Sequence, residues 1–218
     1  MAYSIAIIGG TGAEGSGLAL RWANAGHRVI IGSRDPAKAQ ALADEFNSKL
    51  GTSLTSGASS DEAAAFAEIV VLTVPYASQL TMARALKEKL QGKILIDVTV
   101  PLVPPKVSQV QLPAAGSCVV AVQQELGESV RVVSAFQNVS AHKLKDLEYS
   151  IKCDVLVCGN DKEARQIAMR LAKDAGLRGI DAGVLANSTV AESLTSALIW
   201  INRTYKVPDA GIMITGIH

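Results

Sequence analysis

The residues with the clearest chemical signature are three glycines near the N-terminus, in the pattern Gly10-x-Gly12-x-x-Gly15. They follow an apolar run at residues 4–8 and precede a segment with helical character. A strand that turns through glycines into a helix directs free amide groups and the positive end of the helix dipole at one point, where a pyrophosphate can bind. An ordinary glycine-rich turn is the alternative. The position between a strand and a helix favours a dinucleotide site.

The end of the second predicted strand bears on which dinucleotide binds. Enzymes that use NAD place a carboxylate here, whereas NADP enzymes place a cation near the 2′-phosphate. Ser33, Arg34 and Lys38 occupy this region and favour NADP(H), unless both cations are simply solvated surface charges. Asp35 could be an NAD-type acid, but an Asp before Pro36 is typical of a helix N-cap.

The elements that must position these residues alternate along the chain. Apolar, β-branched runs predict strands at residues 4–8, 28–32, 54–57, 69–73, 94–98, 130–135, 154–158 and 179–181. Helices are expected at residues 15–25, 36–50, 61–67, 78–90, 118–126 and 162–175. Continuous apolar strands between helices predict an α/β fold with a doubly wound, mostly parallel sheet of the Rossmann type.

Two regions depart from this alternation. Residues 101–117 contain four prolines, so we expect an irregular loop that reaches over a ligand. Residues 187–205 predict a long apolar helix carrying Trp200, capped by Asn187 or Ser188, and residues 207–218 predict no element. We therefore expect a dinucleotide-binding domain at residues 1–185 and a small helical C-terminal subdomain at residues 186–218, which covers a sheet edge or forms a homodimer contact.

The composition excludes several classes of protein. There are 21 basic and 20 acidic residues, a balance that is unlike a nucleic-acid-binding surface. We expect no signal peptide and no membrane-spanning segment, because no apolar run approaches about 18 residues. Cys118, Cys153 and Cys158 lack metal-ligand spacing, so we expect no metal site, and three reduced cysteines fit a cytoplasmic protein.

Beyond these local signals, the chain resembles the NADPH-dependent coenzyme F420 reductases. The similar segments extend along almost the whole chain, at residues 7–12, 17–20, 25–27, 31–34, 71–75, 132–135, 154–159, 176–177, 181–183 and 190–195. The resemblance implies an oxidoreductase that transfers a hydride between NADP(H) and coenzyme F420 or a related flavin-like acceptor.

The family pattern also implies individual contacts. The contacts to NADP(H) would come from Thr11, Gly12, Ala13, Glu14, Ser33, Arg34 and Lys38, and those to its nicotinamide half from Thr73, Val74, Pro75 and Ala141. The chain departs from the pattern after the sixth predicted strand. Gln137 and Ser140 stand where the family's His–x–Ile–Pro segment has its His and Pro, and residues 99–105 replace a shorter family segment.

No pair of residues suited to acid–base or nucleophilic catalysis stands out, so we expect no catalytic side chain. Hydride transfer between two rings requires mainly that the protein orient them and exclude water. The acceptor side of the site is expected to comprise Val98, Thr99, Gln137, Asn138 and Val139, although strand-end packing would explain several of them equally well. His142 lies near this region, but a lone histidine is more often structural.

Three hypotheses follow for the function. The first is the F420-type oxidoreductase described above. The second is an NADPH-dependent reductase of another acceptor, such as free flavin, a ferric chelate or a small carbonyl compound. The third is a protein that senses NADP(H) without catalysis and signals through a partner.

Overall fold

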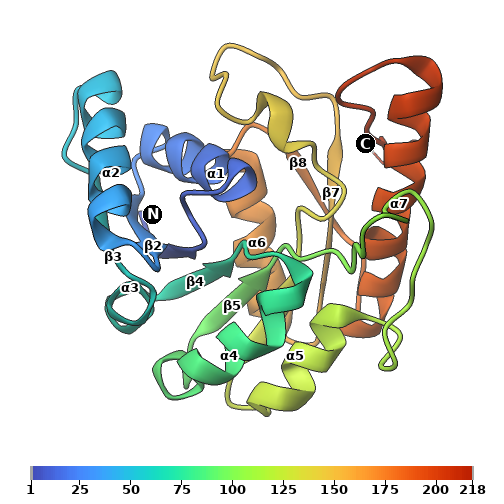
Figure 1. Ribbon diagram of the computed structural model, residues 1–218, viewed down its shortest axis with the longest axis horizontal. Coiled ribbons are helices and arrows are strands. Elements are labelled where there is room, and N and C mark those ends of the chain that lie inside the picture. The colour runs from blue at the N-terminus through green and yellow to red at the C-terminus, as the bar shows by residue number, and fades with distance from the viewer. Residues whose placement is uncertain (1, 218) are drawn as a thin grey trace.

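The computed structural model describes residues 2–217 and is built around one sheet (Figure 1). The eight strands have the spatial order β3-β2-β1-β4-β5-β6-β7-β8. Their bounds are β1 Ser4–Ile8, β2 Arg28–Ser33, β3 Thr55–Ser59, β4 Ile69–Leu72, β5 Ile94–Asp97, β6 Arg131–Ser134, β7 Asp154–Gly159 and β8 Arg178–Asp181. Neighbouring strands are parallel, except that β6 and β7 are antiparallel. The prediction of a doubly wound, mostly parallel sheet is confirmed.

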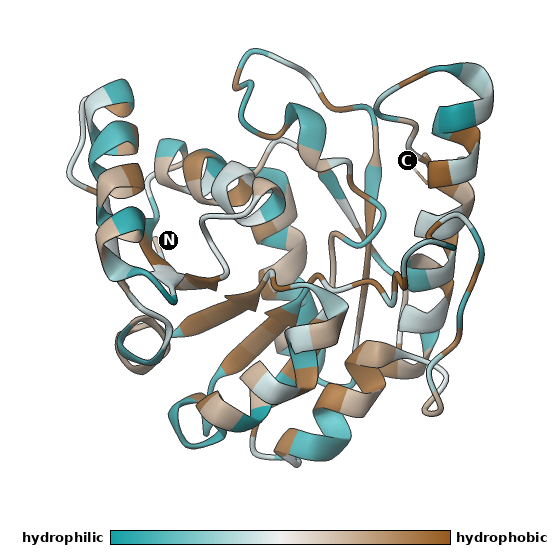
Figure 2. Ribbon diagram, in the orientation of Figure 1, coloured by the Kyte–Doolittle hydropathy of each residue, from teal (hydrophilic) through white to brown (hydrophobic). Residues whose placement is uncertain are grey.

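Helices cover both faces of the sheet. The first core cluster joins it to α1 (Ala13–Asn24), α2 (Pro36–Leu50) and α6 (Lys162–Asp174). The second joins its other face to α3 (Ser60–Phe66), α4 (Tyr76–Leu90) and α5 (Cys118–Leu126). Figure 2 shows the expected result, with hydrophobic colour on the inner strands and hydrophilic colour on the outer helix faces. There are two short 3-10 helices among the described residues. The first, η1 (Ala141–Lys143), precedes β7, and the second, η2 (Leu185–Asn187), precedes the last helix, α7 (Ser188–Tyr205).

Several element boundaries differ from the prediction by one or two residues, and the two described next have local explanations. Helix α4 begins at Tyr76, two residues early and directly after its N-cap Pro75, whose fixed φ suits the start of a helix. Strand β5 ends at Asp97, because the Asp97 carboxylate accepts a hydrogen bond from the backbone N–H of Thr99 at 2.9 Å. That bond turns the chain away from the sheet, as Asp side chains commonly do in turns.

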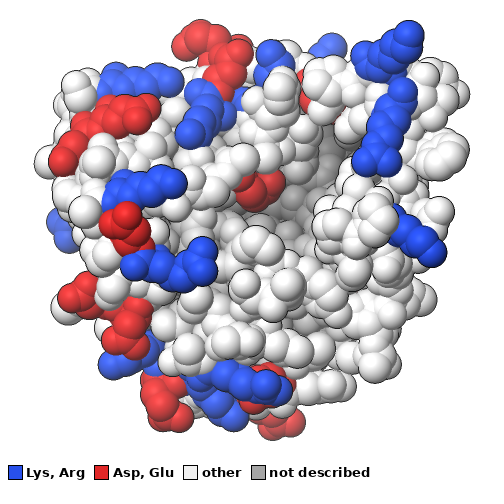
Figure 3. Space-filling model, in the orientation of Figure 1, with Lys and Arg blue, Asp and Glu red and all other residues white. Residues whose placement is uncertain are grey.

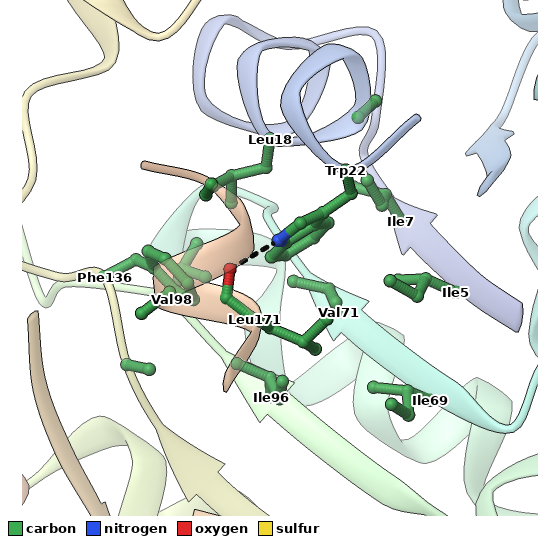
Figure 4. Close-up of a cluster of buried hydrophobic side chains, with 14 of the residues drawn as sticks. Ile5, Ile7, Leu18, Trp22, Ile69, Val71, Ile96, Val98, Phe136 and Leu171 are labelled. Carbon is green, nitrogen blue, oxygen red and sulfur yellow. Dashed lines mark hydrogen bonds between the residues drawn. The ribbon is translucent and has the colours of Figure 1, made fainter. Parts of the chain in front are cut away.

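Trp22 on α1 joins the sheet to α6 (Figure 4). The indole is fully buried and donates from Nε1 to the carbonyl oxygen of Leu171 at 2.8 Å, so its polar group is satisfied. The ring meets Phe136 edge to face, with centroids 5.8 Å apart. Since Phe136 follows β6, this contact fixes the chain beside the carboxyl edge of the sheet.

The buried guanidinium of Arg21 fixes the loop that returns from β6 to β7. It donates to the carbonyl oxygens of Leu144 at 2.7 Å and Asp146 at 2.7 Å, and to that of Ala175 at 2.9 Å. Buried carbonyl groups require a hydrogen-bond partner, and this one side chain supplies it to two distant segments of the backbone.

The C-terminal region contacts the sheet in two places. Helix α7 packs near β7 and α5, and the segment after it bonds to β7 through the N–H of Asp154 and the carbonyl oxygen of Ile212, at 2.8 Å. The expected division at residue 185 therefore stays a prediction.

Within residues 2–217, no helix has both the length and the apolar character to cross a membrane. The irregular loop expected at residues 101–117 contains neither helix nor strand.

Candidate functional site

The largest described cleft lies at the carboxyl edge of the sheet, where the strand order changes direction. After β1 the chain proceeds to β2 and β3 on one side, then returns to β4 on the other. The crevice at such a reversal is the usual ligand position in doubly wound sheets. The cleft has a volume of about 900 Å³. Figure 3 shows a hollow near the centre of the molecule with mostly uncharged walls.

The glycine turn forms one wall of this cleft. Gly9 adopts a φ of +81° and its N–H donates to the carbonyl oxygen of Gly32 at 3.0 Å, which holds the turn against β2. Gly12 then serves as the N-cap of α1 and offers no side-chain cap, so the first amide groups of the helix are left for a ligand. A Cβ on Gly15 would stand 2.5 Å from Thr73 Oγ1, so this residue lets α1 approach β4.

The end of β2 reaches the same cleft through Ser33 and Arg34. Asp35 is the N-cap of α2 and accepts from the N–H of Lys38 at 3.1 Å, so its carboxylate serves the helix as the sequence predicted. Ser33 Oγ accepts from the N–H of Asp35, and Arg34 remains exposed at the rim. Lys38 is exposed on α2 and does not line the cleft.

The structure brings most of the predicted site residues together. Thirteen of the cleft residues were expected from the sequence: Thr11, Gly12, Ala13, Glu14, Ser33, Arg34, Thr73, Val74, Pro75, Val98, Thr99, Gln137 and Val139. Five other predicted residues lie outside the lining. Gly10 and Gly15 support the turn, Lys38 is on the outer side of α2, Ala141 packs against the core from η1, and Asn138 is buried.

Asn138 is occupied by the backbone of β7. Its Nδ2 donates to the carbonyl oxygen of Asp154 at 2.6 Å, and it also lies 3.3 Å from Cys153 Sγ. The side chain is 2% exposed. Asn138 thus secures the loop behind the cleft, which leaves Gln137 as the amide on the acceptor side.

The orientation of the Gln137 amide is set by Asp97. Gln137 Nε2 donates to the main-chain oxygen of Asp97 at 2.7 Å, and exchanging the amide nitrogen and oxygen would place two oxygens together. Its Oε1 is shielded from water and has no partner within residues 2–217. The amide therefore has a free acceptor oxygen, and any group that bonds to it must be a hydrogen-bond donor.

A buried carboxylate lies beneath the acceptor side. Asp97 is fully buried, and desolvation raises its pKa to about 6 although hydrogen bonds from Thr99 and Gln79 oppose the shift. Gln79 Nε2 donates to its Oδ2 at 2.6 Å. Because these bonds hold the carboxylate between β5 and α4, Asp97 supports the loop of Thr99 from behind the cleft.

Sequence reasoning missed a group of lining residues that the fold adds. They are Ser60, Tyr76, Ala77, Ser78, Thr81, Met82, Ala85, Val100, Leu102, Phe136 and Thr195, together with Gly9 of the turn. The position of α4 directly after β4 was a usable signal for its first turns. Thr195 had none, since it arrives from α7 and donates to the carbonyl oxygen of Gln137 at 2.7 Å.

The chemistry available in the cleft is mainly orientation and exclusion of water. Glu14 and Arg34 are the charged residues of its described lining. No group of three or more metal-ligating residues occurs within residues 2–217. The helix N-terminus and Arg34 suit phosphate groups, and the apolar wall of Val74, Val98 and Val139 suits flat rings. The site thus fits a phosphorylated dinucleotide together with a second aromatic ligand.

Comparison with known proteins agrees with this geometry. Residues 4–101 match the family model described as "NADP oxidoreductase coenzyme F420-dependent". The F420-dependent NADP reductase of Methanocaldococcus jannaschii is 42% identical, covering 98% of this chain and 99% of its own. The F420-dependent NADP reductase of Methanothermobacter thermautotrophicus is 38% identical, and the match covers 100% of this chain and 97% of that protein. A crystal structure of a candidate F420-dependent NADP reductase from Arthrobacter sp. FB24 superposes with a TM-score of 0.79 at 28% identity. The superposition covers 98% of this chain and 99% of that chain.

Proposed function

Because the chain belongs to the F420-dependent NADP reductase family, we propose that it transfers a hydride between NADP(H) and coenzyme F420. One observation carries the proposal: a relative of this activity is 42% identical over essentially its whole length, the part that forms the acceptor side included. The cleft supports it, because it has room and apolar walls for two rings beside a phosphate-binding turn.

NADP(H) would lie along the carboxyl edge of the sheet. The N-terminus of α1 would hold the pyrophosphate, and Ser33 and Arg34 at the end of β2 would meet the 2′-phosphate of the adenosine ribose. Thr73, Val74 and Pro75, after β4, would contact the nicotinamide half. Ala141 and Lys38 stay proposed contacts on the resemblance alone, as both lie outside the lining of the cleft.

The acceptor would occupy the side formed by β5, β6 and α7. The nicotinamide and deazaflavin rings supply the hydride chemistry when they are bound. The residues of this chain orient the rings and exclude water: Val98 and Val139 offer apolar surface, and Gln137 offers an acceptor. Holding two reactants in register can lower a barrier by roughly 7–11 kcal/mol, so the site needs no catalytic side chain.

Stopped-flow absorbance of protein mixed with NADPH and F420 tests the activity. The expected result is simultaneous loss of the NADPH and F420 bands, with much slower turnover on free flavin, ferric chelate or small carbonyl compounds. Faster reduction of one of those acceptors would show a different reductase. NADPH binding with no acceptor reduced would favour a sensor, and a partner captured by one redox form of the dinucleotide would identify it.

We also propose that the protein is a cytoplasmic homodimer. The three cysteines are free and buried, which fits a reducing compartment. Helix α7 leaves Val190, Trp200 and Tyr205 exposed at 62%, 60% and 72%. Large apolar residues gathered on one helix are typical of an interaction surface, and a second copy of the chain would cover them.

A further inference from the structure

Glu14 is an acidic residue in a cleft suited to phosphate. It is the second residue of α1 and the one acid among the described residues that line the cleft. Its Oε1 is shielded from water and has no hydrogen-bond partner within residues 2–217. No Lys, Arg or His of the described chain pairs with it. Although the residue is partly exposed, a carboxyl oxygen that is shielded from water and has no partner requires an explanation.

No neighbouring element supplies a charge that compensates for Glu14. Helix α1 packs against β1, β2, η1 and α6. Strand β1 has no titratable residue, and η1 offers His142 and Lys143, of which Lys143 lies over the ring of Tyr149. On α6, Asp174 pairs with His27. The other charged residues of this helix, none of which forms an ion pair with Glu14, are Lys162, Glu163, Arg165, Arg170 and Lys173.

Strand β2 carries Arg28 at its amino end, and Arg34 follows its carboxyl end at the rim of the cleft. Desolvation raises the pKa of Glu14 to about 8, and no charged neighbour contributes to this shift.

The ionised form of Glu14 would oppose the ligand. A helix N-terminus favours an anion, and the phosphates of a dinucleotide would use the same positive end of α1. A carboxylate there would repel them, whereas the neutral acid has an O–H to donate. The two protonation states thus have opposite effects on the same ligand.

We propose that Glu14 is a neutral carboxylic acid in the complex, donating its O–H to an oxygen of bound NADP(H), so that binding retains one proton on the protein. The inference rests on the proposed NADP(H) site and does not depend on the acceptor. When Glu14 is ionised in the free protein, binding takes one proton from the solvent onto its carboxylate, and no other bond changes.

Titration calorimetry with NADP+ at pH 8.5, in two buffers of different ionisation enthalpy, tests the proposal. A pKa near 8 in the free protein predicts uptake of roughly 0.5–0.8 proton per NADP+ bound. Above about pH 8, Kd should rise towards tenfold per pH unit, because ever fewer molecules carry the proton. The 2′-phosphate, whose second pKa is about 6, is already fully ionised in this range.

Two variants test whether Glu14 is the group that takes up the proton. Glu14→Gln keeps a donor but cannot ionise, so its uptake should fall close to zero and its Kd should stay constant from pH 7 to 9.5. Glu88→Gln, on the exposed face of α4, is the matched control and should behave like the wild type. Wild-type binding without proton uptake would overturn the proposal even if Glu14→Gln did not fold, as would unchanged uptake in that variant. Wild-type protein that binds no NADP+ at pH 7 would instead refute the proposed function.

Discussion

At the end of β2, adjacent residues divide the tasks of binding and folding. Asp35 caps α2, and Ser33 accepts a hydrogen bond from its N–H, so both contribute to the turn. Arg34 has an exposed side chain at the rim of the cleft and is the cation of its described lining. The carboxylate that resembled an NAD-type acid thus caps the helix, and Arg34 is left as the proposed contact to the 2′-phosphate.

Replacing Arg34 with Ala should change dinucleotide selectivity. A charge-assisted contact to the 2′-phosphate is worth about 1.5–3 kcal/mol, so Kd for NADPH should rise roughly 10- to 150-fold while Kd for NADH stays nearly constant. Fluorescence titration of both dinucleotides measures this. Lys49→Ala, an exposed cation on α2, is the control. Equal weakening of both ligands would show that Arg34 does not contact the 2′-phosphate.

At the scale of elements, Glu192 joins α7 to α5. Its buried carboxylate accepts from Ser117 Oγ at 2.5 Å and from the N–H groups of Cys118 and Val119 at 2.9 and 3.3 Å. These are the first amide groups of α5, so a residue of one helix caps another more than 70 positions earlier. The same helix brings Thr195 to the cleft, so this link also positions part of the site.

Glu192→Ala should therefore destabilise the protein. Removing the acceptor leaves the buried N–H of Cys118 unpaired, at a cost of about 1–3 kcal/mol, whereas the N–H of Val119 keeps its bond to Ser117 Oγ. We therefore expect a loss of about 2 kcal/mol in the free energy of unfolding. Urea unfolding followed by circular dichroism gives this value. Glu45→Ala, exposed on α2, should change it by less than about 0.5 kcal/mol. A similarly small change for Glu192→Ala would show that the link is not a major source of stability.

At the scale of the whole molecule, exposed aromatic residues distinguish two surfaces. Trp200 and Tyr205 lie on α7, which also carries the exposed Val190 and Ile201, whereas Phe66 stands alone on α3 at 77% exposure. Isolated exposed apolar residues are common on monomers, but a group on one helix indicates a contact surface. This contrast supports α7 as the interface of the proposed homodimer.

Trp200→Glu should dissociate that dimer, because a charge would have to be buried at the interface without a partner. Light scattering after size exclusion should give twice the chain mass for the wild type and for Phe66→Glu, and a single chain mass for Trp200→Glu. Circular dichroism should show that all three are folded. A monomeric wild type at micromolar concentration would contradict the proposed assembly, and a dimeric Trp200→Glu would move the interface away from α7.

Most strands, most helices and much of the proposed donor half of the site could be predicted from the sequence alone. Strand β1, the turn at Gly12 and helix α1 are consecutive in the chain, so local periodicity and glycine positions are enough to predict them. Arg34 could be placed at the end of β2 for the same reason. Asp35 could likewise be assigned to its helix, because capping is a local interaction.

Several features of the proposed acceptor half depend on tertiary contacts. Which half of the Gln137 amide is free depends on Asp97, 40 residues earlier, and Asn138 faces away from the cleft because it bonds to β7. Thr195 enters the site from α7, a helix whose own Glu192 bonds to the distant first turn of α5. The unpaired state of Glu14 likewise depends on which elements surround α1. Such contacts join segments far apart in the chain, so no local pattern records them and only packing determines them.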